Sequence, residues 1–423
     1  MDLNVGFISF RFAGTDGVSL ETAKWAEILE GMGLNVFYMA GELDTPEEKS
    51  FCVELAHFKN PLIKEIYEPC YTLNKRPRSL TNRIYEIKEE LKNSLYEFKR
   101  KFKLDIIVPQ NALAIPLNIP FGIALTEFIS ETGIFTIAHH HDFFWERKRF
   151  LTNCVWDYIN MCFPPHLSPI QHVVINSSAQ NQLALRTGIS STLVPNIMDF
   201  ENPPKAPDEY TKNVRKDLGI ADDELFILQP TRVVQRKGIE HAIELVARLE
   251  MKTTFVISHA SGDEGYEYED RVREYAAMLG IKAIFVERII NEHRGLTKDG
   301  RKIYTLQDIY PYADLVTYPS LFEGFGNAFL ETIYFKKPIL VNNYSIYSHD
   351  IKPKGFKVIE MDDFISQKTV DETKGILLNP ELASEMAETN YALGKKYYSY
   401  ETARAKLCTI LTTMFGNLAC GRK

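Results

Sequence analysis

Two carboxylates flank a glycine-rich turn in the last third of the chain. Glu323 and Glu331 begin and end the segment EGFGNAFLE, and Gly324 and Gly326 between them allow a ligand to come close to the backbone. Carboxylates accept hydrogen bonds from vicinal hydroxyl groups, so the pair suits a sugar and a ribose. A capped helix with two solvated acids is one alternative. The acid and base of a glycoside hydrolase are another, although a Rossmann-like chain is an unusual place for them.

Two cations precede a predicted helix in the segment TRVVQRKG. Arg232 and Lys237 are close enough in sequence to reach one anion near the helix N-terminus. The free N–H groups and the dipole of that helix end already favour phosphate. The alternative is a solvated basic loop. Because this segment follows a predicted strand, as the carboxylate segment does, we favour a phosphate ligand.

Three consecutive histidines end another apolar run, in the segment AHHHDFFWERKR. Side chains alternate along a strand, so His139 and His141 share one face and His140 takes the other. The three make a poor tridentate metal site, and we predict no bound metal. The basic cluster at 147–149 that follows is either a solvated face or the contact for an acidic acceptor.

Apolar runs alternate with amphipathic helices along the whole chain, which predicts parallel, doubly wound sheets. The segment FENPPKAPDEY at 200–210 breaks this pattern, and the pattern restarts after it. We therefore predict an α/β protein with two Rossmann-like domains, residues 1–200 and 201–395, facing a central cleft where ligands bind. A helix in 396–423 can cross back to the first domain. The predicted strands are 5–10, 34–39, 104–108, 134–138, 172–176, 225–229, 253–258, 283–286, 314–318 and 338–341.

One predicted helix, at 80–102, has a continuous apolar face. Lys88, Glu89, Lys92 and Lys99 are predicted on its other face, which indicates a surface helix packed on the sheet. Its basic residues leave open a role at a membrane surface. These residues are Arg83, Lys88, Lys92, Lys99, Arg100, Lys101 and Lys103.

The composition indicates a soluble globular protein and disfavours nucleic acid as its main partner. The chain has 423 residues, and Asp plus Glu (56) outnumber Lys plus Arg (49), whereas binders of phosphate backbones usually carry a basic excess. No apolar run approaches the roughly 18 residues of a spanning helix. The N-terminus reads as a strand and not as a signal peptide. The six cysteines lack C-x-x-C spacing, so we expect reduced thiols in a cytoplasmic protein and no zinc site.

These motifs together resemble the family-4 retaining glycosyltransferases of the GT-B fold. The resemblance rests on the E-x7-E segment, the Arg-x4-Lys-Gly segment, the stretch PNIMDF, and a tail, KKYYSYETARAKL, that is similar to the family's closing helix. It covers nearly the whole chain and is most specific at 321–331. It implies a metal-independent enzyme without a cofactor. Such an enzyme transfers a hexose, with retention, from a nucleoside-diphosphate sugar of the GDP-mannose or UDP/ADP-glucose type to a hydroxyl acceptor.

The resemblance also implies a role for each matching residue. Glu323 binds hydroxyls of the donor sugar, Glu331 holds the ribose, and Arg232 and Lys237 grip the diphosphate. His141 lies beside the anomeric carbon, with His140 as the alternative. The backbone of the 325–327 turn lines the sugar and diphosphate, and the loop at 14–19 approaches the phosphate or acceptor although Asp16 replaces a glycine there. Ser258 to Asp263, which includes His259 and Gly262, stands where relatives often have a glycine-rich loop. The residues whose backbone would approach the donor or the acceptor are Gly17, Phe325, Gly326 and Asn327.

Several functions remain open at this point. HHHDFFWERKRF and QNALAIPLNIPFG resemble, within the family, enzymes that make small charged glycosides such as mannosylglucosylglycerate. A lipid- or polysaccharide-directed transferase is the alternative. Intact Glu323, Glu331, Arg232 and Lys237 argue against a non-catalytic sugar-nucleotide-binding protein. The absence of G-x-G-x-x-G after the first predicted strand argues against a dehydrogenase.

Overall fold

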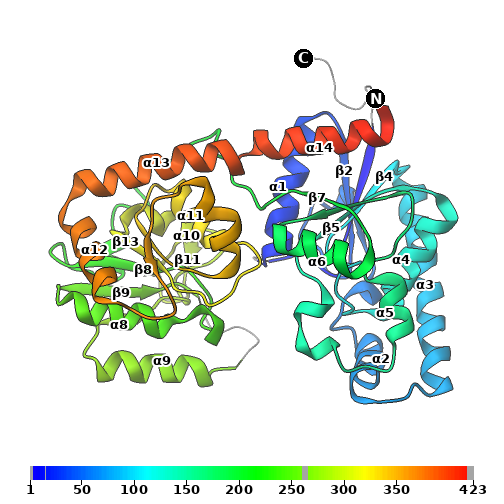
Figure 1. The fold of residues 1–423 in the computed structure, drawn as a ribbon, viewed down its shortest axis with the longest axis horizontal. Helices are drawn as coiled ribbons and strands as arrows, with labels where there is room; N and C mark the ends of the chain where they lie inside the picture. Colours follow the sequence, from blue (N-terminus) through cyan, green and yellow to red (C-terminus); the bar gives the residue numbers. More distant parts are fainter. Residues whose placement is uncertain (1–2, 15, 260–264, 417–423) are drawn as a thin grey trace. The chain divides into compact units, whose positions relative to one another are not determined.

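The computed structural model describes residues 3–14, 16–259 and 265–416 and divides the chain into two compact units (Figure 1). Unit 1 is Met1–Asn196 with Glu401–Lys423, and unit 2 is Ile197–Tyr400. Each unit contains one fully parallel sheet wound by helices. The predicted α/β class with two Rossmann-like units is confirmed.

Unit 1 has a sheet of seven strands in the order β3-β2-β1-β4-β5-β6-β7. This order is the doubly wound one, in which the chain winds outward from β1 in both directions. The strands are β1 (Asn4–Ile8), β2 (Asn35–Ala40), β3 (Ser50–Cys52), β4 (Ile106–Pro109), β5 (Phe135–His140), β6 (Ile170–Val174) and β7 (Ser191–Leu193). The helices are α1 (Gly17–Gly31), α2 (Pro61–Thr72), α3 (Arg78–Phe102), α4 (Ile119–Thr132), α5 (Trp156–Cys162), α6 (Ser177–Thr187) and α14 (Tyr400–Phe415).

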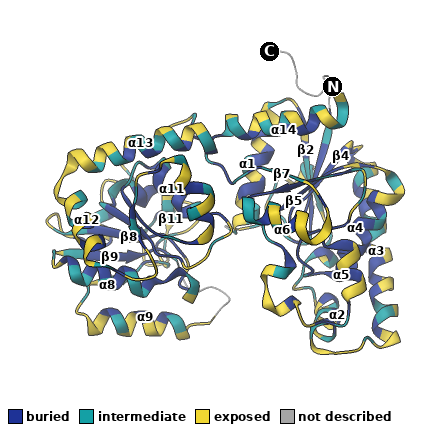
Figure 2. Cartoon of the chain, viewed as in Figure 1, coloured by how far each residue is buried: buried dark blue, intermediate teal, exposed yellow. Residues whose placement is uncertain are grey.

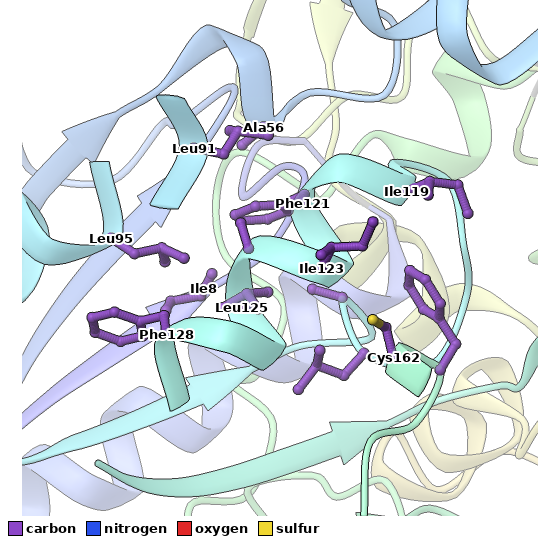
Figure 3. Packing of buried hydrophobic residues seen from close by; sticks show 14 of the residues in the cluster. Ile8, Ala56, Leu91, Leu95, Ile119, Phe121, Ile123, Leu125, Phe128 and Cys162 are labelled. Atoms are coloured by element: carbon purple, nitrogen blue, oxygen red, sulfur yellow. The ribbon is translucent and has the colours of Figure 1, made fainter. Parts of the chain in front are cut away.

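Alternate residues of the unit 1 strands pack on the two faces of the sheet. Ile8, Ile107 and Ala138 join a large apolar cluster with the buried sides of α2, α3, α4 and α5 (Figure 3). The next residue after Ala138, His139, stacks on Trp25 of α1, which therefore covers the opposite face. The strands are buried, and the exposed residues gather on the outer sides of the helices (Figure 2).

Helix α3 differs from the sequence prediction at one residue. Lys88 was expected on the polar face, but its side chain is only 4% exposed and its Nζ lies 2.9 Å from Glu127 of α4. Lys92 pairs with the same carboxylate at 2.7 Å. The expectation that Lys88 lies on the polar face is wrong, because its side chain is buried against α4, where the half-buried carboxylate of Glu127 pairs with it.

Unit 2 repeats the same winding with six strands, in the order β10-β9-β8-β13-β14-β15. Helices α8, α9 and α12 pack in one apolar cluster with the sheet, and α11 contacts β13, β14 and α13. The strands are β8 (Leu225–Gln229), β9 (Thr253–Ile257), β10 (Ala283–Phe285), β13 (Leu315–Tyr318), β14 (Ile339–Asn342) and β15 (Ile359–Met361), with a small ribbon of β11 (Gly295–Leu296) and β12 (Lys302–Ile303). The helices are α7 (Val214–Asp217), α8 (Ile239–Leu249), α9 (Glu267–Met278), α10 (Leu306–Ile309), α11 (Asn327–Tyr334), α12 (Gln367–Leu378) and α13 (Pro380–Tyr398).

The division between the units falls at Asn196, before the Pro-rich segment. Phe200 is buried, and its ring lies against Gly394 of α13, where an added Cβ would come within 2.5 Å. The backbone N–H of Met198 donates to the Tyr398 carbonyl. These contacts tie residues 197–200 to unit 2, whereas α14, which follows α13 directly, belongs to unit 1. There Lys406 donates to the Leu193 carbonyl at 2.6 Å.

Four cysteines are free thiols: Cys52, Cys70, Cys154 and Cys162. Cys408 of α14 is disulfide-bonded. The expectation that the cysteines are reduced is therefore wrong for Cys408. Among the described residues, no helix combines the length and apolar character needed to cross a membrane.

Candidate active site

The predicted cations and Glu323 lie in two loops at the carboxyl ends of neighbouring strands. Strand β8 leads to Arg232 and Lys237, and strand β13, its partner in the sheet, leads to Glu323. The two loops touch at Gly238, whose φ is +58° and where a Cβ would lie 2.6 Å from the Pro319 carbonyl oxygen. Only glycine combines this conformation with this approach.

Glu323 forms ion pairs with two cations of the loop that follows β8. Its Oε1 pairs with Lys237 Nζ, and its Oε2 lies 2.9 Å from Arg236 Nη1. Burial opposes ionisation of Glu323, but Lys237 and Arg236 outweigh it, so the pKa of this carboxyl lies below its ordinary value. Arg236 and Lys237 are therefore the two cations that converge on one anion, and the anion is the carboxylate of Glu323. Arg236 was not among the predicted site residues.

Arg232 stands apart from this ion-pair cluster. Its side chain is exposed, with no ion-pair partner among the described residues. Burial and, to a smaller extent, the charges of Arg232 and Lys237 together lower the pKa of His259 to about 4. His259 Nδ1 lies 2.7 Å from Ser258 Oγ. Arg232 and Lys237 of the β8 loop therefore place positive charge beside His259 at this end of the sheet. Gly262 lies outside the described residues.

Tyr344, in the loop that follows β14, holds the glycine-rich turn in place. Gly326 has φ +132°, and a Cβ there would lie 2.7 Å from Tyr344 Oη. The same hydroxyl donates to the Phe325 carbonyl at 2.7 Å. The Phe325 ring is buried edge-on against Tyr398. The turn can therefore start α11 at Asn327 with the glycine backbone in a conformation that other residues avoid.

Glu331 lies in α11, one helical turn beyond Asn327. Its Oε2 accepts a hydrogen bond from the hydroxyl of Tyr310 at 2.8 Å, and Tyr310 is fully buried. Burial, together with the charge of Glu331, raises the pKa of Tyr310 well above its ordinary value, so the phenol remains a donor. The carboxylate is thereby held in one orientation.

In unit 1, the histidines alternate across strand β5 as predicted. His139 and His141 are neighbours, with ring centroids 4.4 Å apart. His140 takes the other face, where its Nε2 lies 2.9 Å from His172 Nδ1 in the interior. The buried pair disfavours His140 as the reserve candidate, because its ring is committed to the core.

His141 is held by residues that follow strand β4. Its Nε2 lies 3.0 Å from Gln110 Oε1, and its backbone N–H donates to Asn111 Oδ1 at 3.0 Å. Burial lowers the pKa of His141 to about 4, although Asp142 and Asp16 oppose the shift. The ring is therefore neutral at physiological pH. Gln110 and Asn111 were not among the predicted site residues, although they begin the stretch QNALAIPLNIPFG that carries part of the family resemblance.

Gly17 is the first residue of α1 and is exposed. Asp16, which replaces a glycine of the family pattern, caps this helix by accepting from the N–H groups of Val18 and Ser19. Arg11 Nη2 lies 3.2 Å from the same carboxylate. Asp16 thus stabilises the helix start, and Gly17 leaves the surface there open.

The basic cluster after β5 is partly neutralised. Arg147 pairs with Asp142, whose other oxygen accepts from Asn111 Nδ2 at 2.6 Å. Arg149 is exposed and lies over the ring of Phe150. Within the described parts of the chain, acids, histidines and cysteines form no group of three that could hold a metal ion.

Comparison with protein families matches residues 211–392 to the glycosyl transferases group 1. Two curated proteins match over most of the chain. The mannosylglucosylglycerate synthase of Petrotoga mobilis is 33% identical, covering 85% of this chain and 86% of its own length. The mannosylglucosylglycerate synthase of Thermotoga maritima is 32% identical over 94% and 97%.

Solved structures share the fold at low sequence identity. A glycosyltransferase from Rickettsia africae superposes with a TM-score of 0.70 at 14% identity, covering 98% of this chain and 99% of its own. Anabaena HepE, solved in complex with UDP and glucose, gives 0.64 at 13% identity, covering 97% and 100%. Both comparisons support the two-unit architecture.

Proposed function

The chain belongs to the glycosyl transferases group 1, and from that membership we propose that it transfers a hexose from a nucleoside-diphosphate sugar to glucosylglycerate or a closely similar small acidic glycoside. The anomeric configuration of the donor is retained in the product. The nucleotide sugar is a co-substrate, and no metal or other cofactor takes part.

The observation that carries this proposal is the extent of the similarity to the two mannosylglucosylglycerate synthases. It covers 85% and 94% of the chain, so it includes unit 1 as well as the donor-type motifs of unit 2. A galactosylglucosyldiacylglycerol synthase matches at 24% over only 49% of the chain. The greater extent of the similarity therefore favours the small acidic acceptor over a lipid.

Within unit 2 we assign the donor site. Arg232 and Lys237 stabilise the leaving diphosphate, whose charge grows as the glycosidic bond breaks. Glu323 binds hydroxyls of the hexose, and Glu331 holds the ribose. The backbone of the turn lines the sugar and the diphosphate at Phe325, Gly326 and Asn327. Arg232 has no ion-pair partner among the described residues, which supports its role, because a cation without a protein counter-charge attracts an anionic ligand more strongly than a paired one.

Within unit 1 we assign His141 and Gly17 to the acceptor side of the reaction. A neutral His141, with its Nε2 held by Gln110, can orient a sugar hydroxyl by hydrogen bonding. It is poorly suited to take up a proton, because its pKa is lowered to about 4. This supports a mechanism in which a donor phosphate oxygen, and not a protein base, receives the acceptor proton.

A lipid- or membrane-directed transferase is the second candidate, and the structure disfavours the helix that suggested it. Lys88 and Lys92 of α3 are paired with Glu127, and Arg83 is paired with Glu86. Paired cations attract anionic lipid headgroups less strongly than free ones.

The experiment is a donor and acceptor screen. GDP, UDP, ADP and their mannose and glucose conjugates are tested by thermal unfolding, and each stabilising conjugate is then incubated with glucosylglycerate, with diacylglycerol glycosides in vesicles, and with buffer alone. We expect product only with glucosylglycerate. Product with the vesicles would favour the lipid acceptor. Nucleotide binding without any product would indicate a sugar-nucleotide-binding protein.

A further inference from the structure

Arg236 is attached to the segment 321–323 at several points. Its Nη1 lies 2.9 Å from Glu323 Oε2 and donates to the Phe322 carbonyl at 3.4 Å. Its guanidinium lies over the Phe322 ring, with the carbon 5.7 Å from the ring centroid. Its own carbonyl accepts from the N–H of Leu321 at 2.8 Å. This arginine is therefore fixed to the loop that carries Glu323, and not only to its own loop.

Glu323 shares its charge between two cations that the proposed reaction uses differently. Lys237 faces the diphosphate in the proposed function, and a diphosphate competes with Glu323 for its ammonium group. Side chains of Lys237 and Glu323 are each only 10% exposed. A buried carboxylate that loses its counter-charge is costly to keep ionised. Some other cation must then compensate Glu323 while the donor is bound.

The remaining neighbours of Glu323 cannot supply that charge. Tyr318 and Tyr344 face it as neutral phenols, whose pKa values are raised by burial and by the charge of Glu323. Ser320 also faces it but carries no charge. Arg232 acts on Lys237 and on His259, and in the described residues it makes no ion pair with Glu323. Arg236 is left as the cation in contact with the carboxylate.

We propose that Arg236 is a positioning residue that keeps the Glu323 carboxylate ionised and aimed at the donor hexose while Lys237 is engaged by the donor diphosphate. The inference rests on the proposed function, because it assumes that Glu323 binds the hexose and Lys237 the diphosphate. It adds a task for a residue that touches neither ligand. A lysine at this position would keep the charge but lose the contacts of the guanidinium fork.

The test compares Arg236→Gln and Arg236→Lys with the wild type over a range of pH. As control we choose Arg301→Gln, because Arg301 is an exposed arginine that pairs with Asp299 in the β11–β12 turn. For Arg236→Gln we expect the acid limb of the kcat profile to move upward by about one pH unit, as when one of two cations beside a carboxylate is removed. Arg236→Lys should restore most of this shift. Affinity for the nucleoside diphosphate alone should not change, since that ligand lacks the hexose.

The outcomes separate this inference from the proposed function. If the wild type transfers hexose and Arg236→Gln keeps the wild-type acid limb, the role of Arg236 is refuted and the function stands. A loss of kcat that is equal at every pH and that Arg236→Lys does not restore would also refute it, because a purely structural defect behaves in that way. A wild type that transfers no hexose from any nucleotide sugar would refute the proposed function itself. If Arg236→Gln unfolds, the pH profile of Arg236→Lys decides, since a weakened ion pair should still move the limb in the same direction.

Discussion

At the scale of single residues, Lys237 is the side chain whose charge the proposed transition state needs most. It is buried beside Glu323, and the burial lowers its pKa even though Glu323 opposes that shift. A buried ammonium group interacts more strongly with a diphosphate than an exposed one, because water screens it less.

We predict that Lys237→Ala lowers kcat by about 10²- to 10³-fold, by analogy with the loss of one preorganised oxyanion donor. The KM for the donor should change less, because Arg232 still faces the ground-state diphosphate. Saturation kinetics with the donor varied will measure both. Lys252→Ala is the control, since Lys252 is exposed and paired with Asp223. A Lys237→Ala enzyme with full turnover would remove Lys237 from the catalytic residues.

Glu331 should show the opposite kinetic pattern. Its proposed ligand, the ribose, does not change charge during the reaction, so the interaction is equal in ground and transition states. We predict that Glu331→Ala raises the donor KM by about tenfold, or ~1.4 kcal/mol of binding free energy, with a smaller change in kcat. Glu381→Ala, at an exposed position in the first turn of α13, serves as control. A fall in kcat without a change in KM would show that Glu331 does not hold the ribose.

At the scale of elements, the turn into α11 depends on one glycine. An alanine at Gly326 would need φ near +132° and would place its Cβ 2.7 Å from Tyr344 Oη. We predict that Gly326→Ala lowers the free energy of unfolding by about 1–3 kcal/mol, as expected for a strained backbone, and reduces donor binding. Gly375→Ala is the matched control, because nothing lies within 4 Å of its Cβ and it sits inside α12. Chemical denaturation of both variants checks the prediction, which fails if they have equal stability.

The buried histidines link strands β5 and β6 and make stability depend on pH. Burial lowers the pKa of His172 to about 4, and that of its partner His140 well below its usual range. In an unfolded chain a histidine titrates near about 6.5. Between these values the unfolded chain binds more protons than the folded one, so stability is fully present above about pH 6.5 and falls as the pH decreases toward 4.

We therefore predict that His172→Gln flattens the dependence of unfolding free energy on pH between about 6.5 and 4, by up to about 1.4 kcal/mol per pH unit. Glutamine can still hydrogen-bond to His140 but cannot titrate. Urea unfolding at a series of pH values will measure the slope, with His293→Gln at an exposed position as control. Equal slopes for the wild type and His172→Gln would contradict the role of this pair.

The strands that the sequence predicted correctly are those with long apolar runs. Strand β8 matches the predicted bounds, and β4, β9, β13 and β14 differ by only a few residues. The strands that it missed are β3, β7 and β15, each of three residues and each at a sheet edge, and the two-residue strands β11 and β12. Strand β10 is as short and also lies at an edge, but its three residues are all apolar and it was predicted. Short edge strands are therefore found from the sequence only where they keep an apolar run.

At the scale of the whole molecule, the repeated βαβ pattern predicted two similar units because it needs only local periodicity. Contacts between residues that are far apart in the sequence could not be predicted from local periodicity. The ion pair of Arg236 with Glu323 joins the loops that follow β8 and β13, and the ion pair of Lys88 with Glu127 joins α3 and α4. The residue types and spacing indicated Glu323 and Lys237 as site residues and the family resemblance added their roles, but neither could show that they contact each other.

The proposed reaction moves a hexose with retention from a nucleotide sugar to a small acidic glycoside without a metal. The most direct measurement is an NMR time course of the reaction of GDP-mannose with glucosylglycerate in the presence of excess EDTA. We predict a mannosylated product that has, from its first appearance, the anomeric configuration of the donor. An inverted product, or a reaction that stops in EDTA and resumes with magnesium or manganese, would contradict the account.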